Sequence, residues 1–219
     1  MIKAIIFDFD GLLVNTEELR EISIRNFLMA KGKHFKVRDY IALMKSTSDE
    51  TGMYLKKKFE LRGSVKEINN QRRKFFEELF ESRLVLMEGV DVFLRKLRSF
   101  KLKKGITSGR NRKDVIDGLT RLGILDYFKV IVTAEDVNRL KPDPEGYLLA
   151  AKQLHVNPSE CMAFEDTPHG IEAAKMAGMT CVYIPSARYF DSHHPNADLI
   201  VESFAKISNK IFRNLVNGK

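Results

Sequence analysis

The sequence predicts a doubly wound α/β domain with a mostly parallel sheet and an all-helical domain inserted into it. Short apolar runs rich in β-formers recur along the chain, and most of them precede a segment with helical periodicity. Such alternation indicates parallel strands that are covered on both faces. A long stretch after the first run shows helical stripes and no convincing strand, which indicates an insertion.

Six runs are expected to form strands, in the order 4–7, 102–107, 130–134, 161–164, 180–184 and 199–201. The second run is weak because Lys103 and Lys104 interrupt it. Cys161 and Cys181 lie in two of these runs, and two distant cysteines do not make a disulfide framework. We expect both to be reduced residues of the core.

The helices between these runs have apolar residues at the spacing of a single buried face. One stripe is Val90, Phe93, Leu94 and Leu97, and a second is Val115, Ile116, Leu119 and Leu122. The segment 170–178 predicts a short helix that ends before Gly178, because glycine favours the left-handed conformation after a helix.

The insertion covers residues 15–84 and is too long for a simple connection between two strands. We therefore expect a core domain of residues 1–14 and 85–219 and a helical cap domain of residues 15–84. One long helix of the cap carries a single stripe, in which aromatic residues are expected to form the cap core and not a platform for nucleobases. The stripe is Val65, Ile68, Arg72, Phe75, Phe76, Leu79 and Phe80.

Composition is that of a globular protein, with 44% hydrophobic and 30% charged residues. No apolar stretch approaches the roughly 20 residues that span a bilayer. The net charge of +8 suits anionic partners, and the insertion has 16 Lys and Arg against 11 Asp and Glu, a net charge of +5. We expect a soluble, cytoplasmic monomer that acts on a small phosphorylated metabolite, without nucleic-acid or membrane partners.

Polar residues follow several of the expected strands, and parallel strands bring their carboxyl ends to one edge of a sheet. Carboxylates that gather there repel one another unless a cation neutralises them, and oxygen ligands of this kind favour Mg²⁺. Each residue alone is a weak signal. Together they are Asp8 and Asp10 after the first strand, Thr107, Ser108, Gly109 and Arg110 after the second, Lys141 in the loop after the third, and Glu165 and Asp166 after the fourth.

This set predicts phosphoryl transfer. Asp8 is the candidate nucleophile that attacks phosphorus. Asp10 lies two residues further on and can act as general acid and then as general base. Lys141 and the Thr107 hydroxyl can stabilise the phosphoryl oxygens.

The motifs 8–16, Thr107-Ser108, 141–144 and 164–167 with Gly170 resemble the four motifs of the haloacid dehalogenase superfamily, most closely its β-phosphoglucomutase-like branch. The resemblance covers the whole core. It implies a Rossmann-like core, an aspartyl-phosphate intermediate on Asp8 and a cap that closes over the site. It also implies a Mg²⁺ site of Asp8, the Asp10 backbone carbonyl, Asp166 and the nearby Glu165. Substrate phosphate contacts would come from Thr16, Ser108, Gly109, Arg110 and Asn111.

Departures from the family pattern bear on the substrate. Asn15 stands where the family commonly has Asp, and with Glu18 it is expected to cap the helix that follows. In the mutases of this branch, a cap loop carries an Arg that grips the distal phosphate of the substrate. The stretch 45–50 corresponds to that loop, and Asp49 occupies the position of the Arg. Arg110 and Asn111, in contrast, fall where the same mutases contact that phosphate.

Asp49 favours a phosphatase, which passes the phosphoryl group to water, over a hexose-phosphate mutase of the β-phosphoglucomutase type, which passes it to a sugar hydroxyl. A third alternative is a non-catalytic protein whose basic cap binds an anionic polymer or a protein. The intact set of Asp8, Asp10, Lys141 and Asp166 speaks against that alternative. His193 and His194, near Asp191, are expected in a surface loop and not in a metal site.

Overall fold

The computed structural model describes residues 1–43, 46–185 and 196–217, which form two compact units. Residues 1–14 and 85–219 form the α/β core unit, and residues 15–84 form the helical unit. The core holds a six-stranded sheet in the order β3-β2-β1-β4-β5-β6, and all neighbouring strands are parallel. The predicted doubly wound α/β fold is therefore confirmed. The strands are β1 (Ala4–Phe7), β2 (Lys103–Thr107), β3 (Val130–Val132), β4 (Cys161–Glu165), β5 (Thr180–Tyr183) and β6 (Leu199–Ile200).

The second strand forms although two lysines interrupt its apolar run. Lys103 Nζ donates to the Leu154 carbonyl at 2.6 Å, and Lys104 Nζ donates to the Leu102 carbonyl at 3.0 Å. Both lysines lie at the beginning of β2, where long side chains can extend along the surface. The buried part of the strand is its carboxyl end, which includes the candidate site residue Thr107.

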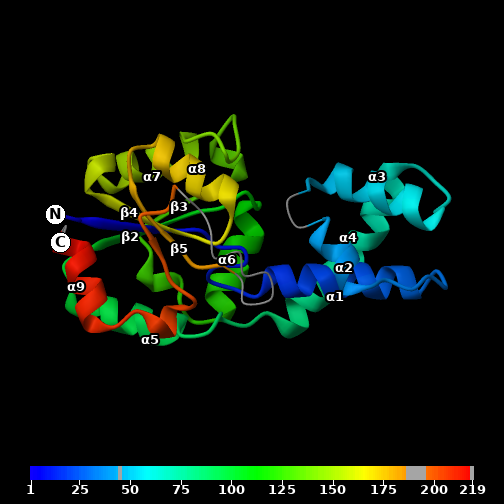
Figure 1. Ribbon diagram of the computed structural model, residues 1–219, viewed down its shortest axis with the longest axis horizontal. Coiled ribbons are helices and arrows are strands. Elements are labelled where there is room, and N and C mark those ends of the chain that lie inside the picture. Colours follow the sequence, from blue (N-terminus) through cyan, green and yellow to red (C-terminus); the bar gives the residue numbers. More distant parts are fainter. Residues whose placement is uncertain (44–45, 186–195, 218–219) are drawn as a thin grey trace. The chain divides into compact units, whose positions relative to one another are not determined.

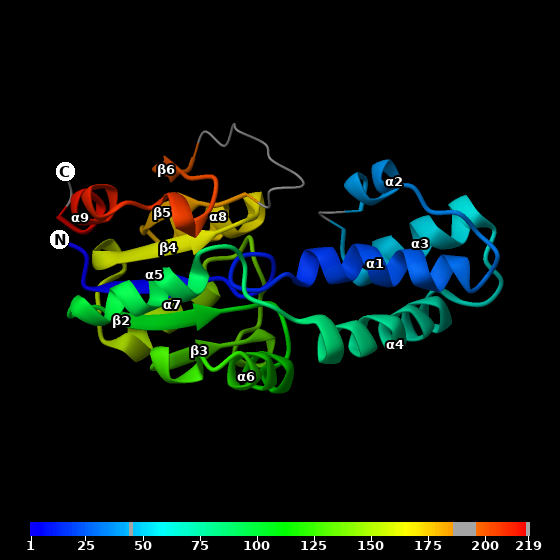
Figure 2. The same ribbon diagram turned by 90° about the horizontal axis from the view of Figure 1, so that it is seen from below.

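Helices cover both faces of the sheet (Figures 1 and 2). On one face, α7 and α8 pack on small and aliphatic residues such as Ala4, Ile6 and Ala163. On the other face, the rings of Phe7 and Phe164 stack at 5.3 Å between centroids and contact Phe93 of α5. The core helices are α5 (Val90–Lys96), α6 (Arg112–Arg121), α7 (Glu145–Leu154), α8 (Pro168–Met176) and α9 (Asn209–Asn217).

The core elements form where the sequence predicts, but several of their bounds differ by one or two residues; the third strand, expected over 130–134, ends at Val132. Val115 and Leu119 of α6 are fully buried, as the second apolar stripe requires. The helix α8 ends before Gly178, which has a φ of +78°. Cys161 and Cys181 are buried and free, which confirms their expected place in the core.

The helical unit consists of α1 (Thr16–Met29), α2 (Val37–Ile41), α3 (Ser48–Phe59) and α4 (Val65–Arg83). The helix α4 packs against both α1 and α3. Its stripe buries Ile68, Leu79 and Phe80, and Phe75 meets Phe27 of α1 edge to face. Aromatic and aliphatic side chains of this stripe thus form part of the core of the helical unit. Among the described residues, no helix is both long and apolar enough to cross a membrane.

Asn15 is the N-cap residue of α1, as expected, but the capping bond expected from its side chain is absent. Its Nδ2 instead donates to the carbonyl of Arg83 at 3.3 Å, at the end of α4. The two ends of the helical unit are therefore joined by this side chain, a long-range contact that sequence spacing does not reveal.

Candidate active site

The register of three neighbouring strands brings the candidate residues together. Phe7 pairs with Ile106 of β2 on one side and with Phe164 of β4 on the other. Asp8 is the next residue after Phe7, so it lies between Thr107 and Glu165. The backbone N–H of Asp8 also donates to the Phe164 carbonyl at 3.0 Å, which extends the pairing by one residue.

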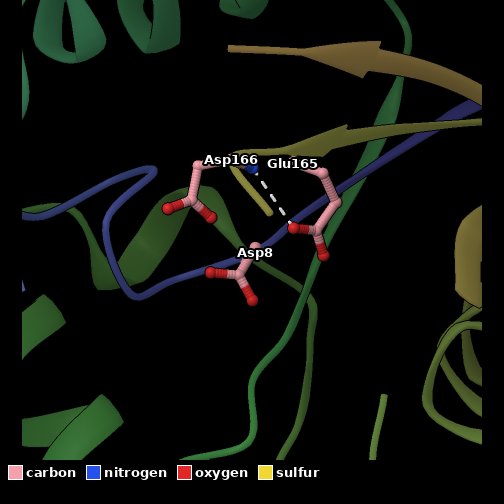
Figure 3. Close-up of side chains that lie close together, drawn as sticks. All are labelled: Asp8, Glu165 and Asp166. Carbon is pink, nitrogen blue, oxygen red and sulfur yellow. Dashed lines mark hydrogen bonds between the residues drawn. The ribbon is translucent and has the colours of Figure 1, made fainter. Parts of the chain in front are cut away.

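The ammonium group of Lys141 contacts the carboxylates at the ends of both β1 and β4. Lys141 Nζ donates to Asp8 Oδ1 at 2.5 Å, to Glu165 Oε1 at 2.5 Å and to the Thr107 carbonyl at 3.2 Å. Asp8, Glu165 and Asp166 offer oxygens that all lie within 4.8 Å of one another (Figure 3). The three carboxylates are buried, with 7%, 0% and 8% of the residue exposed, respectively.

Burial and the neighbouring charges shift the pKa values of the residues in this cluster. Burial raises the pKa of Asp8 to about 8; Lys141 acts against this rise, while the charges of Glu165 and Asp10 add to it. Burial alone would lower the pKa of Lys141, but Asp8 and Glu165 together raise it above its ordinary value. Three carboxylates and one ammonium carry a net charge of −2 when all are ionised. Closely spaced oxygen donors with this charge suit a hard divalent cation, so the residues fit the metal site that the sequence predicts.

Asp10 lies apart from the carboxylate cluster and has its own partners. The Nε and Nη2 atoms of Arg110 donate to Asp10 Oδ1 at 2.9 and 2.6 Å, and Ser108 Oγ donates to Oδ2 at 3.1 Å. Gly11 follows with a φ of +76°, which turns the chain away from the strand. The side chain of Arg110 is only 18% exposed, so it is not a solvated residue at a helix start.

The remaining expected residues of the second motif line the same edge. Asn111 caps α6, since its Oδ1 accepts from the backbone N–H of Asp114 at 2.9 Å. Thr107, Ser108, Gly109 and Lys141 line a core cavity of about 200 Å³. This cavity provides space beside the ammonium group and the second motif.

Other expected contacts belong to the helical unit. Thr16 is the buried first residue of α1, and its contact with phosphate stays a prediction. Asp49 lies in the first turn of α3, where Asn69 Nδ2 donates to its Oδ1 at 3.0 Å. Lys45 of the expected substrate loop and the stretch 186–195, with His193 and His194, lie outside the described residues.

Four supporting residues have roles that escaped the sequence reasoning. Tyr147 is fully buried on α7, and its hydroxyl donates to Glu165 Oε1 at 2.6 Å. The sequence could have indicated this contact, because Tyr147 stands in an apolar helix and a buried hydroxyl needs an acceptor. Glu145 accepts from the backbone N–H groups of Asn138 and Arg139, both at 3.0 Å, and so holds the loop that carries Lys141.

Gly170 is the third, since the motif contained it but its role was not apparent. A Cβ at this position would lie 2.0 Å from the carboxyl group of Glu165. Only glycine therefore leaves space for that carboxylate beneath α8. Gly146 is similar, because its Cβ would lie 2.7 Å from Thr107 Oγ1.

Comparison with known proteins agrees with this geometry. The family model of haloacid dehalogenase-like hydrolases matches residues 5–184. The protein YhcW of Bacillus subtilis is 34% identical over 220 residues, 100% of both chains. The phosphorylated carbohydrates phosphatase of Thermotoga maritima is 31% identical, over 83% of this chain and 84% of its own.

A similar solved structure is the β-phosphoglucomutase of Clostridium difficile. It is 25% identical with a TM-score of 0.77, and the match covers 100% of this chain and 98% of that one. The match spans both the core and the helical unit, and family enzymes of this kind use a divalent metal. The chain therefore belongs to the haloacid dehalogenase-like hydrolases, in their β-phosphoglucomutase-like branch, and it is a phosphatase or a phosphomutase.

Proposed function

We propose that the protein hydrolyses the phosphate monoester of a small metabolite, in the first place a phosphorylated sugar, through an aspartyl phosphate on Asp8 and with Mg²⁺ as cofactor. The observation that carries the proposal is the contact of Asp8 with Lys141 inside the buried cluster of Asp8, Glu165 and Asp166. The T. maritima relative is named for phosphorylated carbohydrates, and a relative from Escherichia coli, 29% identical over 81% of this chain, is named a fructose-1-phosphate phosphatase.

In the first step, a carboxylate oxygen of Asp8 attacks phosphorus, and the bond from phosphorus to the leaving oxygen breaks. Asp10 donates a proton to that oxygen. In the second step Asp10 takes a proton from water, which attacks the phosphorus of the aspartyl phosphate and releases inorganic phosphate and free Asp8. Ser108 and Arg110 orient Asp10, and Lys141 balances the negative charge around Asp8.

The carboxylates of Asp8 and Asp166 and the backbone carbonyl of Asp10 would hold Mg²⁺, with Glu165 beside them. When bound, the ion supplies positive charge that keeps Asp8 ionised and offsets the charge of the phosphoryl group. The neighbouring Lys141 then contacts both Asp8 and Glu165 without having to neutralise all three acids alone.

We assign residues 15–84 the role of a cap domain, and this assignment rests on where the insertion enters the chain, directly after the motif with Asp8 and Asp10. A hexose-phosphate mutase is the second candidate. It is favoured by the similarity to the C. difficile β-phosphoglucomutase over the whole chain. The two activities differ only in the acceptor of the phosphoryl group.

The test is phosphate release from p-nitrophenyl phosphate and from a panel of phosphorylated sugars, with MgCl₂ and with a chelator. We expect hydrolysis that requires the metal and falls by at least about a thousandfold in Asp8→Asn, since this change keeps the shape of the side chain but removes the nucleophile. Asp10→Asn should slow turnover by about 10²–10⁴-fold because general acid–base catalysis is lost.

Equal rates for the wild type and Asp8→Asn would overturn the proposal. Conversion of one hexose phosphate into its isomer, without net release of phosphate, would establish the mutase instead. Inactivity of the wild type across the whole panel would favour the non-catalytic alternative.

A further inference from the structure

The apolar stripe of α4 contains an arginine. Arg72 follows Ile68 by four residues and precedes Phe75 by three, so all three share one helix face. Ile68 is 1% exposed, and Arg72 is half-buried beside it. A guanidinium in this place costs stability unless it is paired, because burial disfavours an isolated charge.

The contacts of Arg72 within the helical unit are neutral. Its Nη2 donates to Ser48 Oγ at 3.0 Å and lies 3.5 Å from Asn69 Oδ1. Its Nε is buried, and within residues 1–43, 46–185 and 196–217 no acceptor lies within reach of that atom. The Nε–H of Arg72 is therefore a hydrogen-bond donor without an acceptor among the described residues.

A second arginine lies nearby on α1. The Nη2 of Arg20 donates to the carbonyls of Leu43 and Ser46 at 3.2 and 3.0 Å and to Thr51 Oγ1 at 3.1 Å. Its nearest carboxylate is Glu17, with an oxygen 3.7 Å from Nη1. That carboxylate also accepts from a buried tyrosine hydroxyl at 2.7 Å, so its charge is shared.

Burial, and next to it the positive charge of Arg20, lower the pKa of Arg72 to about 10, while Tyr40 acts in the opposite direction. Arg72 therefore stays charged at neutral pH, and the two guanidinium groups repel each other. Asp49 accepts a hydrogen bond from Asn69 and, in the part of the chain that the structure describes, forms no ion pair with either arginine. Two neighbouring guanidinium groups, one of which has an unpartnered Nε–H, are suited to a phosphate or carboxylate group.

We propose that Arg20 and Arg72, with the Ser48 hydroxyl, form an anion-binding site in the helical unit that takes a phosphate or carboxylate group. Binding there needs neither Asp8 nor a metal, so the inference stands apart from the proposed function. The anion belongs either to the substrate, as a second charged group, or to a separate small molecule. Asp49 alone is then no argument against a second phosphate.

The experiment uses the full chain labelled with ¹⁵N, in the Asp8→Asn variant and without metal. The buried Nε–H of Arg72 should exchange slowly with water and give a resolved signal at neutral pH. We expect inorganic phosphate and malonate, each added at constant ionic strength, to shift this signal with saturation. The affinity should fall at least tenfold in Arg72→Gln.

Arg73→Gln is the matched control. Arg73 is the next residue on the same helix, its side chain is 64% exposed, and its Nε donates to Glu77. This variant should bind phosphate like the parent. Absence of a saturable shift, or equal loss of affinity in both variants, would overturn the proposal.

A second variant guards against misfolding. Arg72→Met keeps the helix face apolar and removes the uncompensated charge, so its melting temperature should equal or exceed that of the parent. A fall of several degrees would instead mean that Arg72 is structural, and it would contradict the inference.

Kinetics on the Asp8-containing enzyme distinguish the two sources of the anion. If the anion is part of the substrate, Arg72→Gln raises KM at least tenfold for sugar bisphosphates and leaves KM for p-nitrophenyl phosphate unchanged. If it is a separate molecule, both KM values stay unchanged while the spectral shift with phosphate persists. Failure of the catalytic proposal would leave the spectral result intact.

Discussion

The two units of the molecule differ in the charged groups that they leave incompletely paired. The core buries three carboxylates and brings one ammonium group, that of Lys141, against two of them. The helical unit holds the guanidinium groups of Arg20 and Arg72 mainly among carbonyls, hydroxyls and an amide, with the Glu17 carboxylate 3.7 Å from Arg20. Neither arrangement favours folding as an apolar core would. The helical unit also buries the carboxylates of Glu21 and Asp39, but each of these forms an ion pair, with Arg25 and Lys58 respectively. The charge that is left incompletely paired is negative in the core and positive in the helical unit, which supports the proposed cation and anion sites.

Among the variants that test this difference between the units, replacement of Lys141 should have the largest effect on activity and stability. Lys141→Met removes the only cation that contacts both Asp8 and Glu165 in the described structure. We expect kcat to fall by about 10²–10³-fold and the metal-free protein to lose about 3–5 kcal/mol of unfolding free energy. Phosphatase assays and urea denaturation measure the two effects.

Lys175→Met is its control, because Lys175 pairs with Asp198 at 2.6 Å in a partly exposed ion pair. Such a pair contributes about 0–1 kcal/mol. Similar losses for the two variants would mean that burial of the cluster has no special energetic role.

Gly170→Ala should act on the same cluster through shape alone. The added Cβ would lie 2.0 Å from the Glu165 carboxyl, so the carboxylate must move away from Lys141 and Tyr147. We expect the apparent affinity for Mg²⁺ to fall about 10–100-fold, as for the loss of a residue that orients a metal ligand. Activity titrated against Mg²⁺ measures this. Glu172→Ala, an exposed change on the same helix, should leave the titration curve unchanged.

Gly52→Ala applies the same test to the helical unit. Its Cβ would lie 2.6 Å from Asn69 Oδ1 and 2.8 Å from Val65 Cγ1, where α3 and α4 pack closely. We expect a loss of about 1–3 kcal/mol, measured by hydrogen exchange of α3 and α4. Met53→Ala, which changes an exposed neighbour, should have little effect on these helices. Faster exchange in the core strands as well would mean that the two units unfold together.

The smallest effect concerns a paired carboxylate of the helical unit. Burial tends to raise the pKa of Asp39, but hydrogen bonds from Lys58 and the Lys36 backbone lower it below its ordinary value. A lowered pKa stabilises the fold above the unfolded value of about 3.9, and this contribution is lost as the pH falls through the folded value. Asp39→Asn should therefore cost about 1 kcal/mol at pH 7 and progressively less below about pH 4.

Denaturation at several pH values measures the difference between Asp39→Asn and the wild type. The exposed Glu77, which pairs with Arg73, provides the control Glu77→Gln. A pH-independent difference for Asp39→Asn would show that its carboxylate charge does not contribute to stability.

The strands and the site edge were predictable because each depends on a local pattern. Asp8, Thr107 and Glu165 follow β-rich runs, and parallel pairing alone brings the ends of such runs together. The fold class, the helix that ends before Gly178 and the two buried cysteines follow from the same kind of evidence.

The features that were not predicted from the sequence depend on contacts between distant segments. Tyr147 meets Glu165, and Asn15 meets Arg83, at separations that no periodicity encodes. Arg110 binds Asp10, a partner 100 residues away, which the sequence did not indicate; its expected contact with phosphate stays a prediction. Arg72 was visible within the stripe of its helix, yet its lack of a carboxylate partner requires the packing of α1, α3 and α4.

The aromatic layer under the site has a consequence for changes in chain length. Phe7 packs against Phe93 and Phe164 on one face of the sheet, and Asp8 follows immediately at the strand end. Successive strand residues point to opposite faces, so one residue inserted or deleted within β1 would exchange the positions of ring and carboxylate. The packing of the rings therefore sets the register of β1 and with it the position of Asp8. Loops of this enzyme should tolerate length changes that its first strand does not.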